Sequence, residues 1–145
     1  MSDAPAAATR DDLGFLLAKA SQRWNERLQE GFAAAGFPEV RASYGSILVP
    51  LFEEDGLRMG ELAVRARLSK QTMTTMVRLL ERDGLVERRP DPSDARAARI
   101  FLSRHAREFR PAAEAVLADL EVEVRHALGA AATEELRMAL RRLAG

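Results

Sequence analysis

The apolar and polar positions of residues 69–84 recur with the period of a helix. Four apolar residues have the i, i+3, i+4, i+7 spacing of one buried face, namely Met73, Met76, Val77 and Leu80. The opposite face is polar and carries Lys70, Gln71, Thr74, Thr75 and Arg78. Ser69 can cap the first turn, and Gly84 can take the left-handed conformation that closes a helix. The pattern therefore predicts a short amphipathic helix over residues 69–83.

The segment before this helix has the same character. Residues 60–68 predict another short helix, with Leu62, Ala63 and Ala66 facing inward. Only a tight turn separates this helix from the cap of the next one. Two short helices joined this closely predict a helix-turn-helix.

The segment after the helix predicts a β-hairpin. Residues 85–89 and 98–102 have the composition of strands, and residues 90–97 between them are rich in Pro, Asp and Ser, as a hairpin tip is. Residues 57–59 could add a third strand. Two helices followed by a two-stranded wing are the order of a winged helix.

Longer helices are predicted on both sides. Before the winged helix, Thr9 fits a capping pattern, and apolar residues recur at helical spacing until residues 36–38 end the helix. Residues 40–55 predict a second helix, in which Pro50 removes one backbone hydrogen bond and should introduce a kink rather than a break.

After the wing, Ser103 can cap a long helix that runs to about Leu128 and bends at Pro111. Residues 129–132 predict a short connection, and residues 133–143 predict a last helix with leucines on one face.

These elements predict a mainly α protein with a small β-wing, a winged helix-turn-helix plus long N- and C-terminal dimerisation helices. Its segments are a disordered tail at 1–9, an N-terminal dimerisation helix at 10–36, a winged helix-turn-helix DNA-binding region at 40–103 and C-terminal dimerisation helices at 104–145. The apolar stripes of the terminal helices are too long for a small winged helix to cover. A second copy of the same surface is their least costly partner, so we expect a homodimer.

Charge is unevenly distributed, although the net charge of the 145 residues is zero. From Arg58 to Arg110 there are thirteen Lys or Arg and seven Asp or Glu, whereas the remainder has nine basic and fifteen acidic residues. This asymmetry is expected of a basic DNA-facing module on an acidic body. A solvated charged face could mimic it, but would not explain why the basic part coincides with the wing.

Other kinds of chemistry find little support. The absence of Cys excludes disulfides, thiolate metal sites and sensing by thiol oxidation. His105 and His126 lack metal-ligand spacing, so no metal or cofactor is expected, and His105 is expected to be solvated. Because no P-loop, dinucleotide fingerprint or nucleophile elbow is present, no catalytic residue is assigned and an enzyme is not expected. Without a signal peptide or an apolar run of membrane-spanning length, the expected compartment is the cytoplasm.

Five segments carry a specific combination of motifs: residues 57–63, 68–74, 80–86, 91–96 and 102–103. This combination resembles the MarR (multiple antibiotic resistance regulator) family of transcription factors, and the flanking helices match the family in order and length. The wing motif is the most specific part, although Ala95 stands where members often carry a basic residue. The resemblance implies a sequence-specific DNA-binding transcriptional regulator, expected to be a repressor. It would bind a palindromic operator in double-stranded DNA as a homodimer joined by its terminal helices.

In such a protein the polar face of helix 69–83 is expected to enter the major groove. Gln71 is the expected base reader, because its amide can pair bidentately with adenine. Lys70 and Arg78 could read guanine or hold phosphates. The DNA-binding residues expected on this helix are Ser69, Lys70, Gln71, Thr72, Thr74, Thr75 and Arg78. Taken alone, the helix could equally be a solvated helix of any small protein.

The wing, residues 88–99, supplies a second set. Arg96 at its tip is expected to reach the minor groove, where a guanidinium suits narrow A·T-rich DNA. Asp94 either orients Arg96 or stabilises the turn. The phosphate candidates are Arg88, Arg89 and Arg99, and strand alternation allows Arg89 and Arg99 to face opposite sides.

Two aromatic residues are candidates for an effector pocket. Members of the family often bind small aromatic or anionic ligands between the dimer helices and the winged helix. Trp24 and Tyr44 could line such a pocket, with Arg23 or Arg27 nearby. Both aromatic residues also lie on apolar faces, where a core or interface role is the alternative.

The alternative for the whole chain is a winged helix that binds protein without specific DNA binding. Such a module would not need four arginines in its wing, and its recognition face would more often be apolar. The arginines and the polar face of helix 69–83 favour DNA.

Overall fold

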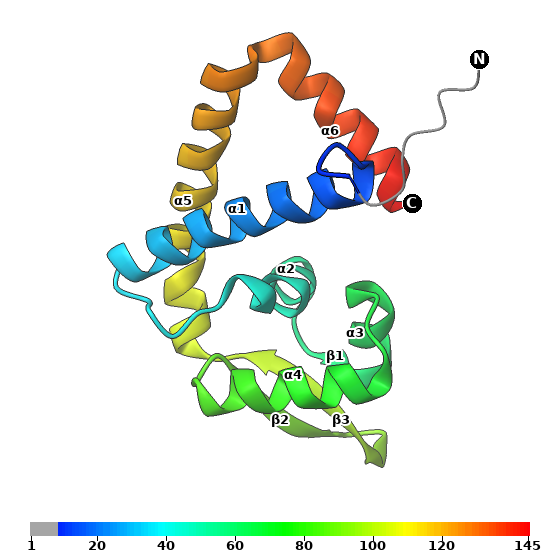
Figure 1. Cartoon of the computed structure of the whole chain (residues 1–145). Coiled ribbons are helices and arrows are strands. Elements are labelled where there is room, and N and C mark those ends of the chain that lie inside the picture. The colour runs from blue at the N-terminus through cyan, green and yellow to red at the C-terminus, as the bar shows by residue number, and fades with distance from the viewer. Residues whose placement is uncertain (1–8) are drawn as a thin grey trace, which may run out of the picture.

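The computed structural model describes residues 9–145, so the predicted disordered tail lies outside the described residues except for Thr9. The elements in chain order are α1 (Leu13–Ala34), the 3₁₀ helix η1 (Ala42–Tyr44), α2 (Gly45–Glu53), β1 (Leu57–Arg58), α3 (Met59–Ala66), α4 (Lys70–Arg82), β2 (Val86–Asp91), β3 (Asp94–Leu102), α5 (Arg104–Leu128) and α6 (Ala130–Ala144). Figure 1 shows α2 to β3 as a lower body, the winged helix, with α1, α5 and α6 above it as three long arms. The predicted fold class, mainly helical with a small wing, is confirmed.

Three antiparallel strands form one sheet in the order β1-β3-β2. β1 pairs with the base of β3, which confirms the predicted third strand. The predicted hairpin tip at 90–97 is too long, because both strands continue into it and the turn consists of Pro92 and Ser93. The Asp91 carboxylate accepts a hydrogen bond from the Ser93 N–H at 3.0 Å and so closes the hairpin directly after β2.

The winged helix has a closed apolar core to which all of its elements contribute. Its largest fully buried side chains include those of Tyr44, Ile47, Leu51, Leu62, Met73, Leu80, Leu85 and Ile100. The predicted stripe of α4 is buried there, with Met76 half-buried at its edge. Because burying one such side chain contributes about 1.5–3 kcal/mol, the stripe holds α4 on the body with its polar face outward.

Helices α1 and α5 cross at a glycine. A Cβ on Gly31 would lie 2.5 Å from Cγ1 of Val116, so only glycine lets α1 approach α5 this closely. Beside the crossing, the rings of Phe32 and Phe109 pack edge to face with centroids 4.9 Å apart. α6 leaves α5 at a sharp corner, where Gly129 has a φ of +86°.

The arms leave many apolar side chains exposed. These are Leu13, Phe15, Leu16 and Leu17 on α1, Leu117, Val122 and Leu128 on α5, and Leu136, Met138, Leu140 and Leu143 on α6. α5 packs on both other arms, yet these stripes remain in solvent within a single chain.

Two predicted helix starts in the arms are wrong. α1 begins behind Asp12 rather than Thr9, because the Asp12 carboxylate accepts a hydrogen bond from the N–H of Phe15. α6 begins at Ala130, so Gly129 alone connects it to α5. The alanines assigned to the connection extend the helix instead, since alanine is the strongest helix former.

The second helix also begins later than predicted, with η1 leading into α2. The side chain of Gln29 donates to the carbonyl of Val40 at 2.7 Å and accepts from the N–H of Ala42 at 3.1 Å. With these two bonds, the backbone groups of Val40 and Ala42 have partners without forming a helix. Because Gln29 lies on α1, the sequence of the segment itself did not indicate this arrangement. α2 then continues through Pro50 as one helix, as predicted.

Candidate nucleic-acid interface

Helix α4 is capped as its sequence predicts. The Ser69 hydroxyl accepts from the Thr72 N–H at 3.1 Å and donates to the Thr72 hydroxyl at 2.9 Å. At the other end, Gly84 has a φ of +74° and closes the helix. In the turn before Ser69, Arg67 takes the left-handed conformation with a φ of 55°, which ends α3 and lets α4 start immediately. The helix-turn-helix is therefore fixed by local caps at every junction.

The outward face of α4 is polar and largely exposed. Thr74 and Thr75 donate their hydroxyl protons to backbone carbonyls of the preceding turn, at 2.9 and 3.1 Å. Their oxygens therefore remain available only as acceptors toward DNA. Among the described residues, no hydrogen bond or ion pair engages the side chains of Lys70, Gln71 or Arg78, which are exposed. This face offers cations, an amide and hydroxyl acceptors to a partner.

At the wing tip, Arg96 is exposed, and its guanidinium has no ion pair among the described residues. Asp94 Oδ1 accepts from the backbone N–H of Arg96 at 2.9 Å and makes no contact with the guanidinium. Of the two roles considered for Asp94, orienting the Arg96 side chain or stabilising the turn, this contact corresponds to stabilising the turn. The tip thus presents one unpaired guanidinium beside an exposed carboxylate that braces the backbone.

The remaining arginines of the wing are engaged to different degrees. Arg88 pairs with Glu81 of α4 at 2.9 Å. Arg89 pairs with Glu87 at 3.0 Å and lies over the ring of Phe101, 4.4 Å from its centroid. Arg99 turns toward the body and donates to the carbonyl of Gly56 at 3.3 Å. The register places Arg89 opposite Arg99, so the two share a face of the sheet rather than facing opposite sides.

A buried carboxylate that the sequence analysis missed lies at the base of the wing. The side chain of Asp91 is 0% exposed and forms ion pairs with Arg58 at 2.5 Å and Arg99 at 3.4 Å. Its pKa is lowered to about 2, mainly by hydrogen bonds from the backbone and hydroxyl of Ser93 and further by the two arginines. The Asp-Pro-Ser turn signal was present, but the arginine partners could not be inferred from spacing.

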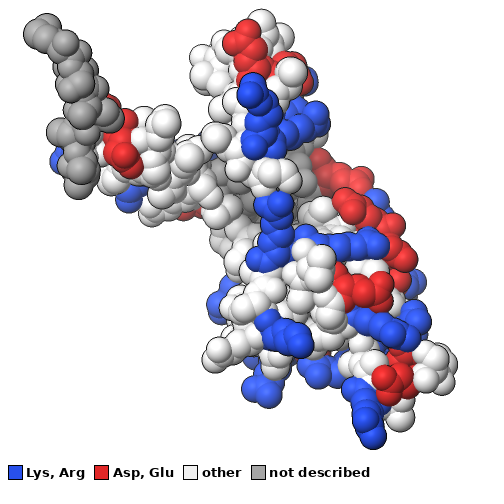
Figure 2. Space-filling view, turned by 90° about the vertical axis from the view of Figure 1, so that its right-hand side faces the viewer, with Lys and Arg blue, Asp and Glu red and all other residues white. Residues whose placement is uncertain are grey.

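Lys and Arg side chains are frequent on one side of the molecule. In Figure 2 they lie on its upper part and spread over its lower part, and many of the Asp and Glu side chains lie along one edge. A surface of this kind attracts phosphates at long range.

The comparisons with known proteins agree with this geometry. The model of the MarR family matches residues 43–98, from η1 into the wing. The match covers the winged helix, so over these residues the chain is similar to the MarR family.

Solved structures extend the similarity to nearly the whole chain. A probable transcriptional regulator from Pseudomonas aeruginosa is 27% identical, with 92% of this chain and 97% of that chain covered and a TM-score of 0.80. The transcriptional repressor CouR, bound to a 23-mer DNA duplex, is 24% identical, with coverages of 92% and 93% and a TM-score of 0.80. PcaV from Streptomyces coelicolor, in complex with its natural ligand, is 21% identical, with both coverages 96% and a TM-score of 0.78. No curated protein matches the chain.

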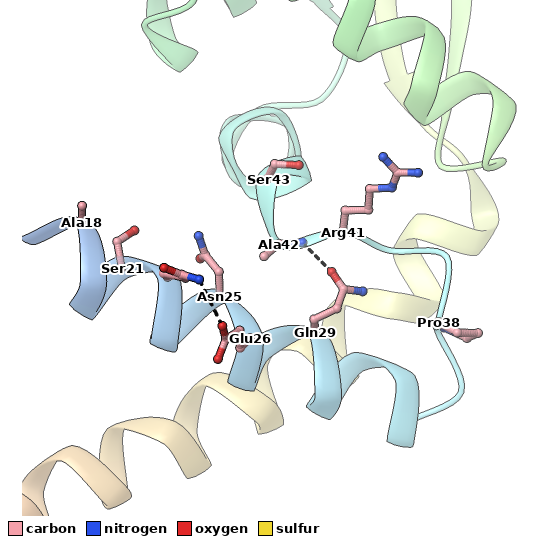
Figure 3. Close-up of a pocket in the computed structure, with 10 residues that line it drawn as sticks. Ala18, Ser21, Asn25, Glu26, Gln29, Pro38, Arg41, Ala42 and Ser43 are labelled. Carbon is pink, nitrogen blue, oxygen red and sulfur yellow. Dashed lines mark hydrogen bonds between the residues drawn. The ribbon is translucent and has the colours of Figure 1, made fainter.

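A groove of about 890 Å³ separates α1 from the segment that leads into α2. It is lined by Ala18, Ser21, Gln22, Asn25, Glu26, Gln29, Pro38, Arg41, Ala42 and Ser43. Figure 3 shows Asn25 and Gln29 on α1 facing the segment that carries Arg41 and Ser43. Seven of the ten lining residues are polar or charged, and among them Arg41 is exposed without an ion pair among the described residues.

The two predicted effector residues lie outside the lining of this groove. Tyr44 is fully buried, and its hydroxyl donates to the Asp83 carboxylate. Burial, and then Asp83, raise the pKa of Tyr44. Trp24 is half-buried and packs against the core. The positions of Trp24 and Tyr44 thus correspond to a role in the core, which was the alternative to a role in an effector pocket.

His105 lies in the first turn of α5, as predicted, but its side chain is only partly exposed to solvent. Its ring bonds to the carboxylate of Glu39 and lies 5.3 Å from the ring of Phe37. The hydrogen bond with His105 is the main cause of the lowered pKa of Glu39. The pair fastens the segment after α1 to the first turn of α5.

Across residues 9–145, the helices include none that is long and apolar enough to cross a membrane. Within the same part of the chain, His, Asp and Glu side chains form no group that could hold a metal ion.

Proposed function

We propose that this chain is a sequence-specific transcriptional repressor that binds a palindromic operator as a homodimer, using α4 and the wing. The observation that carries the proposal is the exposed face of α4, where Lys70, Gln71 and Arg78 are left without partners among the described residues. CouR, a repressor of the same fold, has been solved on a DNA duplex, which supports DNA as the partner here.

In the major groove, each side chain of α4 has a role that fits its chemistry. The Gln71 amide pairs bidentately with adenine, while Lys70 and Arg78 bind guanine or phosphate. Thr74 and Thr75, whose protons are committed to the helix, accept from the amino groups of bases. Ser69 and Thr72 remain a cap that orients the first turn toward a phosphate.

The wing binds beside the recognition helix. Arg96 inserts its free guanidinium into the minor groove, where a narrow A·T-rich stretch concentrates negative potential. Asp94 holds the backbone of Arg96. Arg89 is placed to hold a phosphate, whereas Arg88 and Arg99 hold the wing to the body.

Dimerisation supplies the second half-site. The exposed apolar residues of the arms match the surface that a second copy would cover, and a two-fold axis between copies would place two α4 helices on one palindrome.

The groove between α1 and residues 38–43 is the proposed effector site. The hydroxyl and amide groups of its lining and the unpaired Arg41 suit a small anionic ligand. PcaV, solved with its natural ligand, supports a ligand in a protein of this fold. Trp24 would contribute only if α1 shifts, and Tyr44 stays in the core. If the groove is the site, small anionic compounds such as phenolic acids will raise the Tm of the wild type more than that of Arg41→Ala, and will release it from DNA.

The protein-binding alternative is not favoured, because the exposed face of α4 is cationic and polar rather than apolar.

Two substitutions test the proposal in a salt-dependent anisotropy titration. Arg96→Ala should weaken binding and lower the salt slope by about one unit, because one phosphate or groove contact is lost. Arg104→Ala is the matched control, since it removes the same charge from an exposed arginine of α5 that lies outside α4 and the wing. Equal losses for the two variants would contradict the role of Arg96.

Gln71→Ala should reduce the preference for the operator over random duplex by about 1–3 kcal/mol, because one bidentate base contact disappears. Gln22 is an exposed glutamine on α1, so Gln22→Ala is the control. It should change neither the affinity for the operator nor the affinity for random duplex. If Gln71→Ala weakens binding to both duplexes by the same factor, Gln71 does not read a base.

A further inference from the structure

The base of the wing is held by an ion-pair cluster whose members come from three elements. Asp91 ends β2, Arg99 lies on β3, and Arg58 is the residue from which α3 begins. Ser93 adds two hydrogen bonds to the Asp91 carboxylate, at 3.0 Å from its N–H and 2.8 Å from its hydroxyl. Arg58 also donates to the Ser93 hydroxyl at 3.0 Å. The cluster therefore joins the turn of the wing to the first helix of the helix-turn-helix.

The hairpin needs such a connection because little else holds its outer half. β1 pairs with β3 only at Ile100 and Arg99, near the base. Beyond that point the wing is a two-stranded ribbon, which is flexible by itself. The long side chain of Arg58 extends from β1 along this unsupported part and ends at the turn.

The burial of Asp91 makes other orientations of the wing energetically unfavourable. The Asp91 side chain is fully buried, while the side chains of Arg58 and Arg99 remain partly exposed. A buried carboxylate is stabilised only when cations and hydrogen-bond donors surround it, so any swing of the wing would expose an uncompensated charge. Without the carboxylate, the two guanidinium groups would repel each other.

We propose that Asp91 is a positioning residue for DNA binding. With Arg58 and Arg99 it fixes the angle between the wing and α4, and thereby sets where Arg96 meets the minor groove. The inference rests on the proposed function, because it assigns Asp91 an effect that acts through Arg96.

The sign of one substitution distinguishes this role from simple electrostatics. Asp91→Asn removes a negative charge from a DNA-facing wing, which by charge alone should strengthen binding. The positioning role predicts the opposite, a loss of about tenfold in affinity for the operator. Glu87→Gln is the matched control, since it makes the same change of charge on the same strand outside the cluster. It should leave affinity unchanged or raise it.

A double-mutant cycle then asks whether Asp91 acts through Arg96. In the wild-type background Asp91→Asn should lower affinity and also lower the salt slope, as Arg96→Ala does. In the Arg96→Ala background, Asp91→Asn should cause almost no further loss, because the contact that it misplaces is already gone. A merely structural role would produce the same loss in both backgrounds.

Titrating the wild type in the same experiment separates a failure of the positioning role from a failure of the proposed function. If the wild type binds the operator and Asp91→Asn binds as tightly, or the losses add, the positioning role is overturned and the proposed function survives. If the wild type shows no preference for the operator, the proposed function itself fails. Should circular dichroism reveal that Asp91→Asn is unfolded, Arg58→Gln replaces it, since that side chain is partly exposed. In that case, Arg58→Gln should lower the operator affinity of the wild type but cause almost no further loss in the Arg96→Ala background.

Discussion

The winged helix and the arms differ in how completely they bury their apolar residues. The winged helix encloses Ile47, Leu62 and Leu80 without any exposed surface. In the arms, Leu13 remains 76% exposed and Leu143 73% exposed. A single chain thus completes the core of the winged helix but leaves the arms with unsatisfied surfaces, because apolar area is stabilising only when it is removed from water.

The difference separates two parts of the proposed function. The contacts with one half-site are organised within one chain, by caps, ion pairs and the core behind α4. The pairing of two half-sites depends on surfaces that only a second molecule can cover. Substitutions in the two regions should therefore have different consequences.

The largest effect is expected from a charge in the arms. Leu140→Glu places a carboxylate on the exposed stripe of α6 and should convert the dimer to monomers in sedimentation velocity. Operator affinity should fall by about a hundredfold or more, since the two half-sites are no longer linked. Val49→Glu makes a comparable change at a similarly exposed position of the winged helix, 51% against 42%. If both variants remain dimers, the arms are not the interface.

A cavity in the winged helix should reduce stability without changing the association state. Leu80→Ala removes a fully buried side chain and should lower the free energy of unfolding by about 2–5 kcal/mol. Denaturant unfolding, followed by circular dichroism at several protein concentrations, measures this loss. Val64→Ala, an exposed residue on α3, should change it by no more than about 0.5 kcal/mol. Similar losses for the two variants would contradict the closed core.

A smaller loss is expected where the winged helix fastens the end of α4. Tyr44→Phe removes the hydroxyl that donates to Asp83, and should lower the free energy of unfolding by about 0.5–1.5 kcal/mol. The carboxylate retains its contact with Arg82, which limits the loss. Ser43→Ala, next in the chain but exposed, should have no effect in the same denaturant titration. An unchanged Tyr44→Phe protein would mean that the buried hydroxyl contributes nothing.

A further effect is expected in acid. The pKa of Asp91 is lowered from 3.8 to about 2, so its charged form favours the folded state. This contribution is fully present above about pH 4 and is lost as the pH falls toward 2. Asp91→Asn should therefore show a shallower decline of stability between pH 4 and 2 than the wild type. Parallel declines for the two proteins would contradict the ion-pair cluster.

Local signals were sufficient to predict most of the winged helix. Ser69 caps α4 and Gly84 closes it, so both ends of the recognition helix follow from residues at its boundaries. The apolar stripe between them predicts which face is buried, and hence which side chains are free to meet DNA. The contact of those side chains with DNA stays a prediction.

The features that the sequence did not predict all depend on partners distant in the chain. Asp91 is bound by Arg58 from another element, and the late start of the second helix depends on Gln29 of α1. His105, predicted only as a solvated residue, also bonds to Glu39. Periodicity and capping describe neighbours along the chain, and they carry no information about which side chains meet across the fold.

The most direct test of the account is a fluorescence-anisotropy titration of the full chain against the DNA upstream of its own gene. It should be run at several salt concentrations with random duplex as control. A dimer of the chain should bind tightly, only to DNA that contains a palindrome, and its affinity should fall steeply with salt. Weak binding of equal strength to both duplexes, seen only at low salt, would contradict this expectation and favour a winged helix that binds protein.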